Sequence, residues 1–286
     1  MDRTSAGWGS GLLGVIIFSG SLPATRLAVA ELSPLFLTSA RAAIAGLLGG
    51  ACLVALRQPR PARADLAPLA VVALGVVLGY PLLSALALQY VSAAHSAVFL
   101  GLLPLSTAFF GVLRGGERPR PAFWVFSLVG AAIVAGFALS RGAESSLPGD
   151  LLMLAGILVC GLGYAEGAAL SRRLGGWQVI SWALLLALVP MTMIALAAVP
   201  AHPGGIGTSA WAGLFYVSVF SMLVGFVFWY RGLALGGIAG VGQLQLLQPF
   251  FGLLAAGVVL HEPVAWTMIA AAAAVILCVA GAKRFA

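Results

Sequence analysis

The chain has 286 residues, of which 62% are hydrophobic and only 8% charged, and its mean hydropathy is +1.08. A soluble domain carries about 25% charged residues, so this composition excludes a water-soluble fold and indicates an all-α membrane protein. The net charge of +7 does not indicate nucleic-acid binding, because the basic residues stand singly or in small groups between apolar runs.

Apolar runs long enough to cross a bilayer follow one another along the chain. A helix needs about 20 apolar residues to cross the roughly 30 Å hydrocarbon core. On that criterion we predict ten transmembrane helices, over residues 8–29, 33–56, 66–90, 94–113, 121–140, 149–170, 178–199, 210–232, 239–260 and 264–282. The breaks near 31, 92, 236 and 262 are short, so the helices that they join should form tight hairpins.

The basic residues are concentrated in every second loop between these spans. If both termini are cytoplasmic, Arg26 and Arg141 fall outside, Arg41 lies within a span, and twelve basic residues fall inside. The inner group is Arg3, Arg57, Arg60, Arg63, Arg114, Arg118, Arg120, Arg172, Arg173, Arg231, Lys283 and Arg284. Because cytoplasmic loops carry the excess of Lys and Arg, we predict that both termini are cytoplasmic.

Polar side chains inside the second and third predicted spans are candidates for substrate contact, because such groups usually face a cavity or a partner helix. Tyr80 and Ser84 are four residues apart on one helix face, beside Pro81, and either bind substrate or bond to a neighbouring helix. Arg41 could meet a substrate carboxylate, but we favour snorkelling to the outer surface or an ion pair with Glu31.

The sixth predicted span contains the stretch GLGYAEG, which has the wrong spacing and context for a dinucleotide loop. Its Gly163 and Gly167 form a GxxxG pattern that predicts a helix-packing face, and Tyr164 between them is a candidate substrate contact. Glu166 is a candidate proton site or a partner for a substrate ammonium. Alternatively, Glu166 pairs with Arg173 or lies in water at the cytoplasmic mouth.

The remaining candidates are amides and aromatic rings in later spans. Gln245 and Gln248 are three residues apart, and Pro249 should free a backbone carbonyl near Gln245, so both amides either contact substrate or bond between helices. Phe99 and Trp229 are candidate walls of a cavity, although most aromatic rings in spans face lipid or neighbouring helices.

Two stretches of the chain carry a proline and a glutamate at the same spacing. In LLPLSTAFFGVLRGGERP, Pro104 and Glu117 are 13 positions apart, and in LLQPFFGLLAAGVVLHEP, Pro249 and Glu262 are also 13 positions apart. The offset of 145 residues predicts two five-helix repeats, residues 1–145 and 146–286. Because five is odd, the second repeat must enter the membrane inverted, which is the usual build of secondary transporters.

Ten spans, a duplicated five-helix unit and paired Pro–Glu hairpins resemble the drug/metabolite transporter superfamily, in particular its EamA-type exporters, over nearly the whole chain. In length and layout the chain is similar to that family's bacterial exporters of aromatic amino acids. The resemblance implies a bacterial inner-membrane location, and helices 1, 3, 4, 6, 8 and 9 around a central cavity with helices 5 and 10 at the periphery.

We therefore predict a secondary transporter that exports small amphipathic metabolites, above all aromatic or hydrophobic amino acids, by alternating access. One chain should suffice for the pathway, and the expected bending points are Pro23, Pro81, Pro104 and Pro249. An exporter or facilitator of drugs or other metabolites is the alternative. A membrane-embedded enzyme is disfavoured because the scattered acidic residues form no catalytic cluster, and we expect no cofactor and no metal site.

Overall fold

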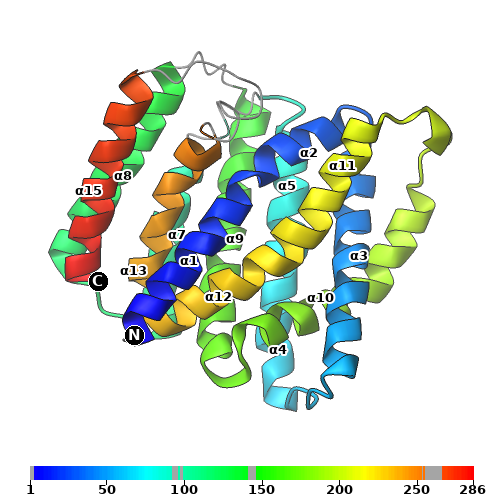
Figure 1. The fold of residues 1–286 in the computed structure, drawn as a ribbon, viewed down its shortest axis with the longest axis horizontal. Coiled ribbons are helices and arrows are strands. Elements are labelled where there is room, and N and C mark those ends of the chain that lie inside the picture. Colours follow the sequence, from blue (N-terminus) through cyan, green and yellow to red (C-terminus); the bar gives the residue numbers. More distant parts are fainter. Residues whose placement is uncertain (1–2, 92–95, 97–98, 141–145, 253, 255–265) are drawn as a thin grey trace.

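The computed structural model describes residues 3–91, 96, 99–140, 146–252, 254 and 266–286. The described elements are helices, and they form one bundle (Figure 1). The first and last helices both bring their termini to the same end of this bundle, which we call the N/C end. Arg141, Glu262 and Pro263, which entered the arguments on topology and repeats, lie outside the described residues.

The helices agree with the predicted spans wherever they are described. In the part of the chain that the structure describes, eight helical segments are long and apolar enough to cross a bilayer, and they coincide with eight predicted spans. They are α1 (Arg3–Ser19) with α2 (Ser21–Val29); α3 (Pro34–Ala55); α4 (Arg63–Val72), η1 (Ala73–Gly79) and α5 (Tyr80–Ala87); α8 (Pro121–Ser140); α9 (Leu147–Leu174); α10 (Gly176–Ala197); α11 (Thr208–Tyr216), η3 (Val217–Val224) and α12 (Gly225–Gly236); and α15 (Trp266–Phe285).

The two other predicted spans, 94–113 and 239–260, are described in part. The first ends in α7 (Leu103–Gly115), and the second begins with α13 (Ile238–Gly242) and the 3-10 segment η4 (Gln243–Leu247). Between α10 and α11 a single 3-10 turn, η2 (Pro203–Gly205), lies in the loop. Helix α3 shows why a span begins where it does, because Pro34 occupies its first turn and the Ser33 hydroxyl accepts from the Phe36 N–H at 3.2 Å.

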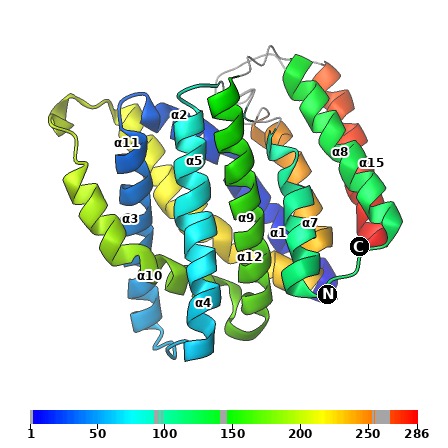
Figure 2. The same cartoon turned by 180° about the vertical axis from the view of Figure 1, so that it is seen from behind.

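The pairing of helices follows an inverted repeat. Helix α3 packs against α10, and α8 packs against α15, so the second and fifth spans of one half meet their own counterparts in the other. Helix α1 packs against α12, and in the matching arrangement α9 packs against η1 and α5. Figures 1 and 2 show α8 and α15 at one edge of the bundle, while α9 crosses its middle. These exchanges are what a two-fold axis in the membrane plane requires.

Both halves carry a π-helical segment at the same place. Subtracting 145 from η3 gives residues 72–79, which is the position of η1. Segments of this kind are rare and often mark functional sites. Pro81 follows η1, but no proline stands near η3, so its break has no comparable sequence signal.

The other predicted bending points also lie beside irregular backbone. Pro23 follows the break between α1 and α2 at Gly20, and Pro104 lies in the first turn of α7. Pro249 follows directly on η4 and Gln248, where the helix has the tighter 3-10 form. Their role as bending points during transport stays a prediction.

Small residues let the two halves approach closely. A Cβ atom on Gly7 of α1 would lie 2.5 Å from the backbone nitrogen of Gly236 in α12, and one on Gly11 would lie 2.5 Å from the Val241 side chain. The GxxxG pair of α9 is a packing face as predicted, with Gly163 against η1 and Gly167 against the Tyr230 ring. In lipid the hydrophobic effect does not drive helices together, so close van der Waals packing of this kind stabilises their association instead.

Gly7→Ala should lower the free energy of unfolding by roughly 1–3 kcal/mol, because the added methyl group overpacks the α1–α12 contact. Gly9, on the same helix, has no neighbouring atom within 4 Å of a built Cβ, so Gly9→Ala is the matched control and should be neutral or slightly stabilising. Thermal unfolding of both variants in one detergent measures the difference. Equal melting temperatures would contradict the close approach.

Candidate functional site

A cavity lies between the two halves of the bundle, in the part that faces away from the N/C end. Its walls come from α1, α2, α3, η1, α5 and α7 of the first half and from α9, η3, α12 and Gln248 of the second. The cavity has a volume of about 40 Å³, enough for a few water molecules. Small-molecule sites measure roughly 300–1,000 Å³, so the cavity must widen before it can hold a ligand of that kind.

Four of the predicted contact residues line this cavity: Tyr80, Ser84, Tyr164 and Gln248. Tyr80 and Ser84 share one face of α5, as their spacing predicts, although the Ser84 hydroxyl also donates to the Pro81 carbonyl at 3.2 Å. The Gln248 side-chain amide donates to the Phe18 carbonyl at 3.3 Å, at the break between α1 and α2. Each half therefore contributes polar groups to the same space.

The other predicted contact residues lie elsewhere. Phe99 packs with the buried group of Ala87, Val91 and Met153. Trp229 is fully buried on α12, against the rings of Phe18 and Tyr164, and does not line the cavity.

Gln245 is buried and bonds to its neighbours instead of facing the cavity. Its amide nitrogen donates to Thr107 at 3.4 Å and to the Gly242 carbonyl at 3.2 Å. The prediction that Pro249 frees a carbonyl near Gln245 is wrong. The chain tightens to 3-10 form there, so the Gln245 carbonyl accepts the backbone N–H of Gln248.

An aromatic layer closes the cavity toward the N/C end. The Phe226 ring lies 5.1 Å from Phe18 and 5.9 Å from Tyr164, and Trp229 lies 5.4 Å from Tyr164, in edge-on arrangements. Below them the Tyr230 hydroxyl donates to the Gly163 carbonyl at 3.1 Å. Trp229 and Tyr230 are fully buried, so the layer is a packed floor.

Arg41 also lines the cavity, contrary to the interpretation favoured from the sequence. Its side chain does not snorkel, since the residue is only 7% exposed, and Nη2 donates to the Ser221 hydroxyl at 3.3 Å. Glu31 is not its partner, because that carboxylate accepts from the Gly207 N–H at 2.7 Å. The sequence did contain a signal for this position: Arg41 lies deep in its span, and no acidic residue on the same helix could pair with it.

Among the described residues, three ion pairs join α9 to the first half at the N/C end, and we call them the α9 ion pairs. They are Arg114–Glu166 at 2.6 Å, Arg172–Glu117 at 2.9 Å and Arg173–Asp65 at 2.5 Å. The hydrogen bond to Glu166 and the attraction between the charges raise the pKa of Arg114 further above its usual value. The alternative that Glu166 pairs with Arg173 is wrong, because each takes a partner from the first half.

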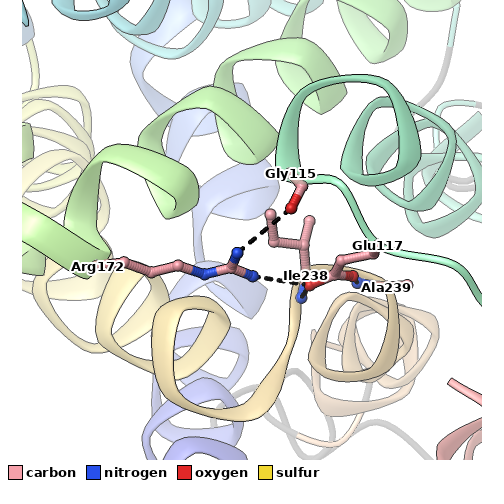
Figure 3. Close-up of polar contacts among 5 residues, drawn as sticks. All are labelled: Gly115, Glu117, Arg172, Ile238 and Ala239. Atoms are coloured by element: carbon pink, nitrogen blue, oxygen red, sulfur yellow. Dashed lines mark hydrogen bonds and ion pairs between the residues drawn. The ribbon is translucent and has the colours of Figure 1, made fainter.

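Glu117 has the largest number of contacts in this group. Its two carboxylate oxygens accept the backbone N–H groups of Ile238 and Ala239, each at 2.7 Å, at the start of α13. Figure 3 shows Arg172 reaching the same carboxylate and the Gly115 carbonyl, the latter at 3.3 Å. The Glu of the repeated hairpin thus ties the α7–α8 loop to the second half, which its spacing alone did not reveal.

Comparison with known proteins identifies relatives along the full length. A model of the EamA-like transporter family matches residues 6–139 and again residues 147–282. The chain is 65% identical over 286 residues to the uncharacterized transporter YdeK of Bacillus subtilis (strain 168), with all of both chains covered. It is 26% identical over 258 residues to an uncharacterized transporter of Archaeoglobus fulgidus, covering 87% of this chain and 88% of the other. One crystal structure has the same fold, with a TM-score of 0.81 over the full length of both chains and 20% identity.

Removing the Glu117 carboxylate should destabilise the protein far more than removing its arginine partner. Glu117→Ala leaves two backbone donors of α13 unpaired, at a cost of about 1–3 kcal/mol for each. Arg172→Ala removes a pair whose arginine is 40% exposed, which should cost about 0–1 kcal/mol. The melting temperatures of the two variants in the same detergent test this order, and a larger loss for Arg172→Ala would refute it.

Proposed function

This chain belongs to the EamA-like transporter family, and we propose that it exports small amphipathic metabolites, above all aromatic or hydrophobic amino acids, as a secondary transporter. A member of this family is an integral membrane transporter and not an enzyme. The observation that carries the finer proposal is the cavity between the halves, walled by Phe18, Tyr164 and Phe226 and edged by hydroxyl and amide groups. Such a lining suits a ligand with an apolar body and one polar end.

In our proposal the N/C end faces the cytoplasm of a bacterium and the protein lies in its plasma membrane. The support is the distribution of basic residues along the sequence: in the predicted topology twelve fall on the side of the two termini, against Arg26 and Arg141 on the other. With that orientation the aromatic floor and the α9 ion pairs close the cytoplasmic side. The cavity then lies on the outer side of this closure.

Alternating access requires that the α9 ion pairs separate. The halves, residues 1–145 and 146–286, would rock against each other, with η1 and η3 as the symmetric places where the helices yield. The three arginines are 50%, 40% and 62% exposed and their carboxylate partners 9%, 18% and 2%, so each pair lies between an exposed pair, worth about 0–1 kcal/mol, and a buried one. A closure of that strength is within reach of the differential binding energy of a substrate.

Glu166 belongs to this closure in our proposal and not to the ligand site, because it does not line the cavity. A proton taken up by Glu166 would release Arg114 and loosen the cytoplasmic side. This is the route by which a pH gradient would act on the cycle. An exporter or facilitator of drugs or other metabolites remains the second candidate, since the apolar walls alone would also accept such ligands.

Efflux from proteoliposomes tests the substrate class. Vesicles loaded with labelled phenylalanine, tryptophan, threonine or lysine should release the two aromatic amino acids and retain lysine, because the described lining of the cavity offers rings but no acidic side chain for a cation. Protein-free vesicles give the leak rate. A pH gradient should change the rate for the wild type and not for Glu166→Gln. Retention of all four amino acids would overturn the amino-acid assignment and favour other metabolites.

Cross-linking across the N/C end should stop transport. In a Cys52→Ser background, Glu117→Cys and Arg172→Cys place two thiols on opposite halves where the native side chains meet at 2.9 Å. A short bifunctional thiol reagent should abolish efflux, and reduction should restore it. The two variants that carry only one of these substitutions, treated in the same way, are the controls, because they also retain Cys160 and Cys278. Full efflux through the cross-linked protein would contradict rocking about this contact.

A further inference from the structure

Arg41 brings a buried positive charge into the wall of the cavity. It lies seven residues into α3, about 10 Å along the axis from Pro34 at roughly 1.5 Å per residue. Its Nη2 atom makes one long contact, 3.3 Å to Ser221, whose oxygen also accepts the Ser21 hydroxyl at 2.8 Å. Its Nε atom is buried and has no hydrogen-bond partner among the described residues.

The groups that face Arg41 around the cavity are neutral. They are hydroxyls, a thiol and an amide, from Ser21, Tyr80, Ser84, Cys160, Tyr164 and Gln248. Among the described residues that line this cavity, Arg41 is the only charged one. The two glutamates that the sequence placed at or within spans are occupied elsewhere, Glu31 with Gly207 and Glu166 with Arg114.

A lone guanidinium in such a place needs a physical reason. Taking a charge out of water costs several kcal/mol even after relaxation, and removal of one partner from a buried pair is strongly destabilising. Ionisable residues inside membrane segments accordingly mark substrate or ion pathways. The Nε and Nη2 atoms form one edge of the guanidinium fork, which matches the two oxygens of a carboxylate.

We propose that Arg41 binds the carboxylate of an organic acid whose apolar body lies against the rings of Phe18, Tyr164 and Phe226. No acidic side chain lines the described cavity, so the ligand needs no ammonium group. This inference rests on the proposed transport function and narrows its substrate class to carboxylates, of which amino acids are one kind. A single arginine also favours a monocarboxylate over a ligand with several negative charges.

A series of ligands that share one phenyl body tests the proposal on the wild-type protein. The four probes are 3-phenylpropanoate, phenylalanine, phenylalaninamide and 2-phenylethylamine, and the readout is the shift of melting temperature of the purified full chain. The two carboxylates should stabilise the protein, and the amide and the amine should bind at least about 30-fold more weakly. Stabilisation by neither carboxylate, or equal stabilisation by the amide, would overturn the proposal.

Substitutions at Arg41 give a second, independent readout. Arg41→Gln should weaken 3-phenylpropanoate at least about 30-fold, and Arg41→Lys should fall between, because it keeps the charge but loses the fork. Arg26→Gln, which removes an exposed arginine from the neighbouring helix α2, is the matched control and should leave affinity unchanged. Unchanged affinity in Arg41→Gln would overturn the assignment.

Ligand-free stability separates a binding role from a structural one. If Arg41 serves to bind an anion, Arg41→Met should raise the melting temperature of the ligand-free protein, because the substitution removes a buried unpaired charge. A marked loss of stability would instead assign Arg41 to the scaffold and refute the proposal.

Transport assays distinguish a failure of this inference from a failure of the proposed function. Arg41-dependent binding of carboxylates without efflux would retain the anion site and reject the transport of these acids. Efflux of phenylalaninamide that is unaffected by Arg41→Gln would retain the transporter and reject the anion site.

Discussion

The contact between α9 and the first half of the chain is the interaction on which the rest of the structure depends. Gly75 and Gly163 allow the two backbones to touch, and a Cβ on Gly75 would lie only 2.5 Å from the Val159 carbonyl oxygen. On one side of this contact Cys160 and Tyr164 of α9 form cavity wall, and on the other its last turns carry the α9 ion pairs. Because one rigid helix holds both features, a movement that opens the N/C end must also move the wall of the cavity.

Charged side chains occur in two opposite settings in this bundle, in ion pairs at the N/C end and as a lone arginine in the cavity wall. The α9 ion pairs lie where water still reaches the arginines, so each arginine can be hydrated when its pair separates. Arg41 lies where water is largely excluded, and a charge without a partner there is expensive. The first arrangement suits a contact that must break in every cycle. The second suits a site that becomes satisfied only when a ligand supplies the missing negative charge.

The sequence allowed the spans and the repeat to be predicted, because length, hydropathy and a fixed offset of 145 residues are properties of the chain itself. Tyr80, Ser84, Tyr164 and Gln248 were also predicted, since polar residues stand out in an apolar span, and all but Tyr164 lie near a proline. The rotation of each helix could not be predicted, because lipid and protein interior are equally apolar. Trp229 and Phe99 therefore could not be told from packing residues, and the partners of Arg41 and Glu166 lie on distant spans.

The scaffold is symmetric, but its charges are not. Subtracting 145 from the three α9 residues of the ion pairs gives Ser21, Leu27 and Ala28, none of which is charged. Among their partners in the first half, only Glu117 has an acidic or basic counterpart, Glu262, whereas Asp65 and Arg114 correspond to Ala210 and Val259. Arg41 corresponds to Leu186, an exposed apolar residue on the outside of α10. Duplication therefore supplied two equivalent ways to close the bundle, one at each end. The residues that correspond to these ion pairs at the other end cannot form the same contacts. Side-chain charge therefore favours closure at the N/C end.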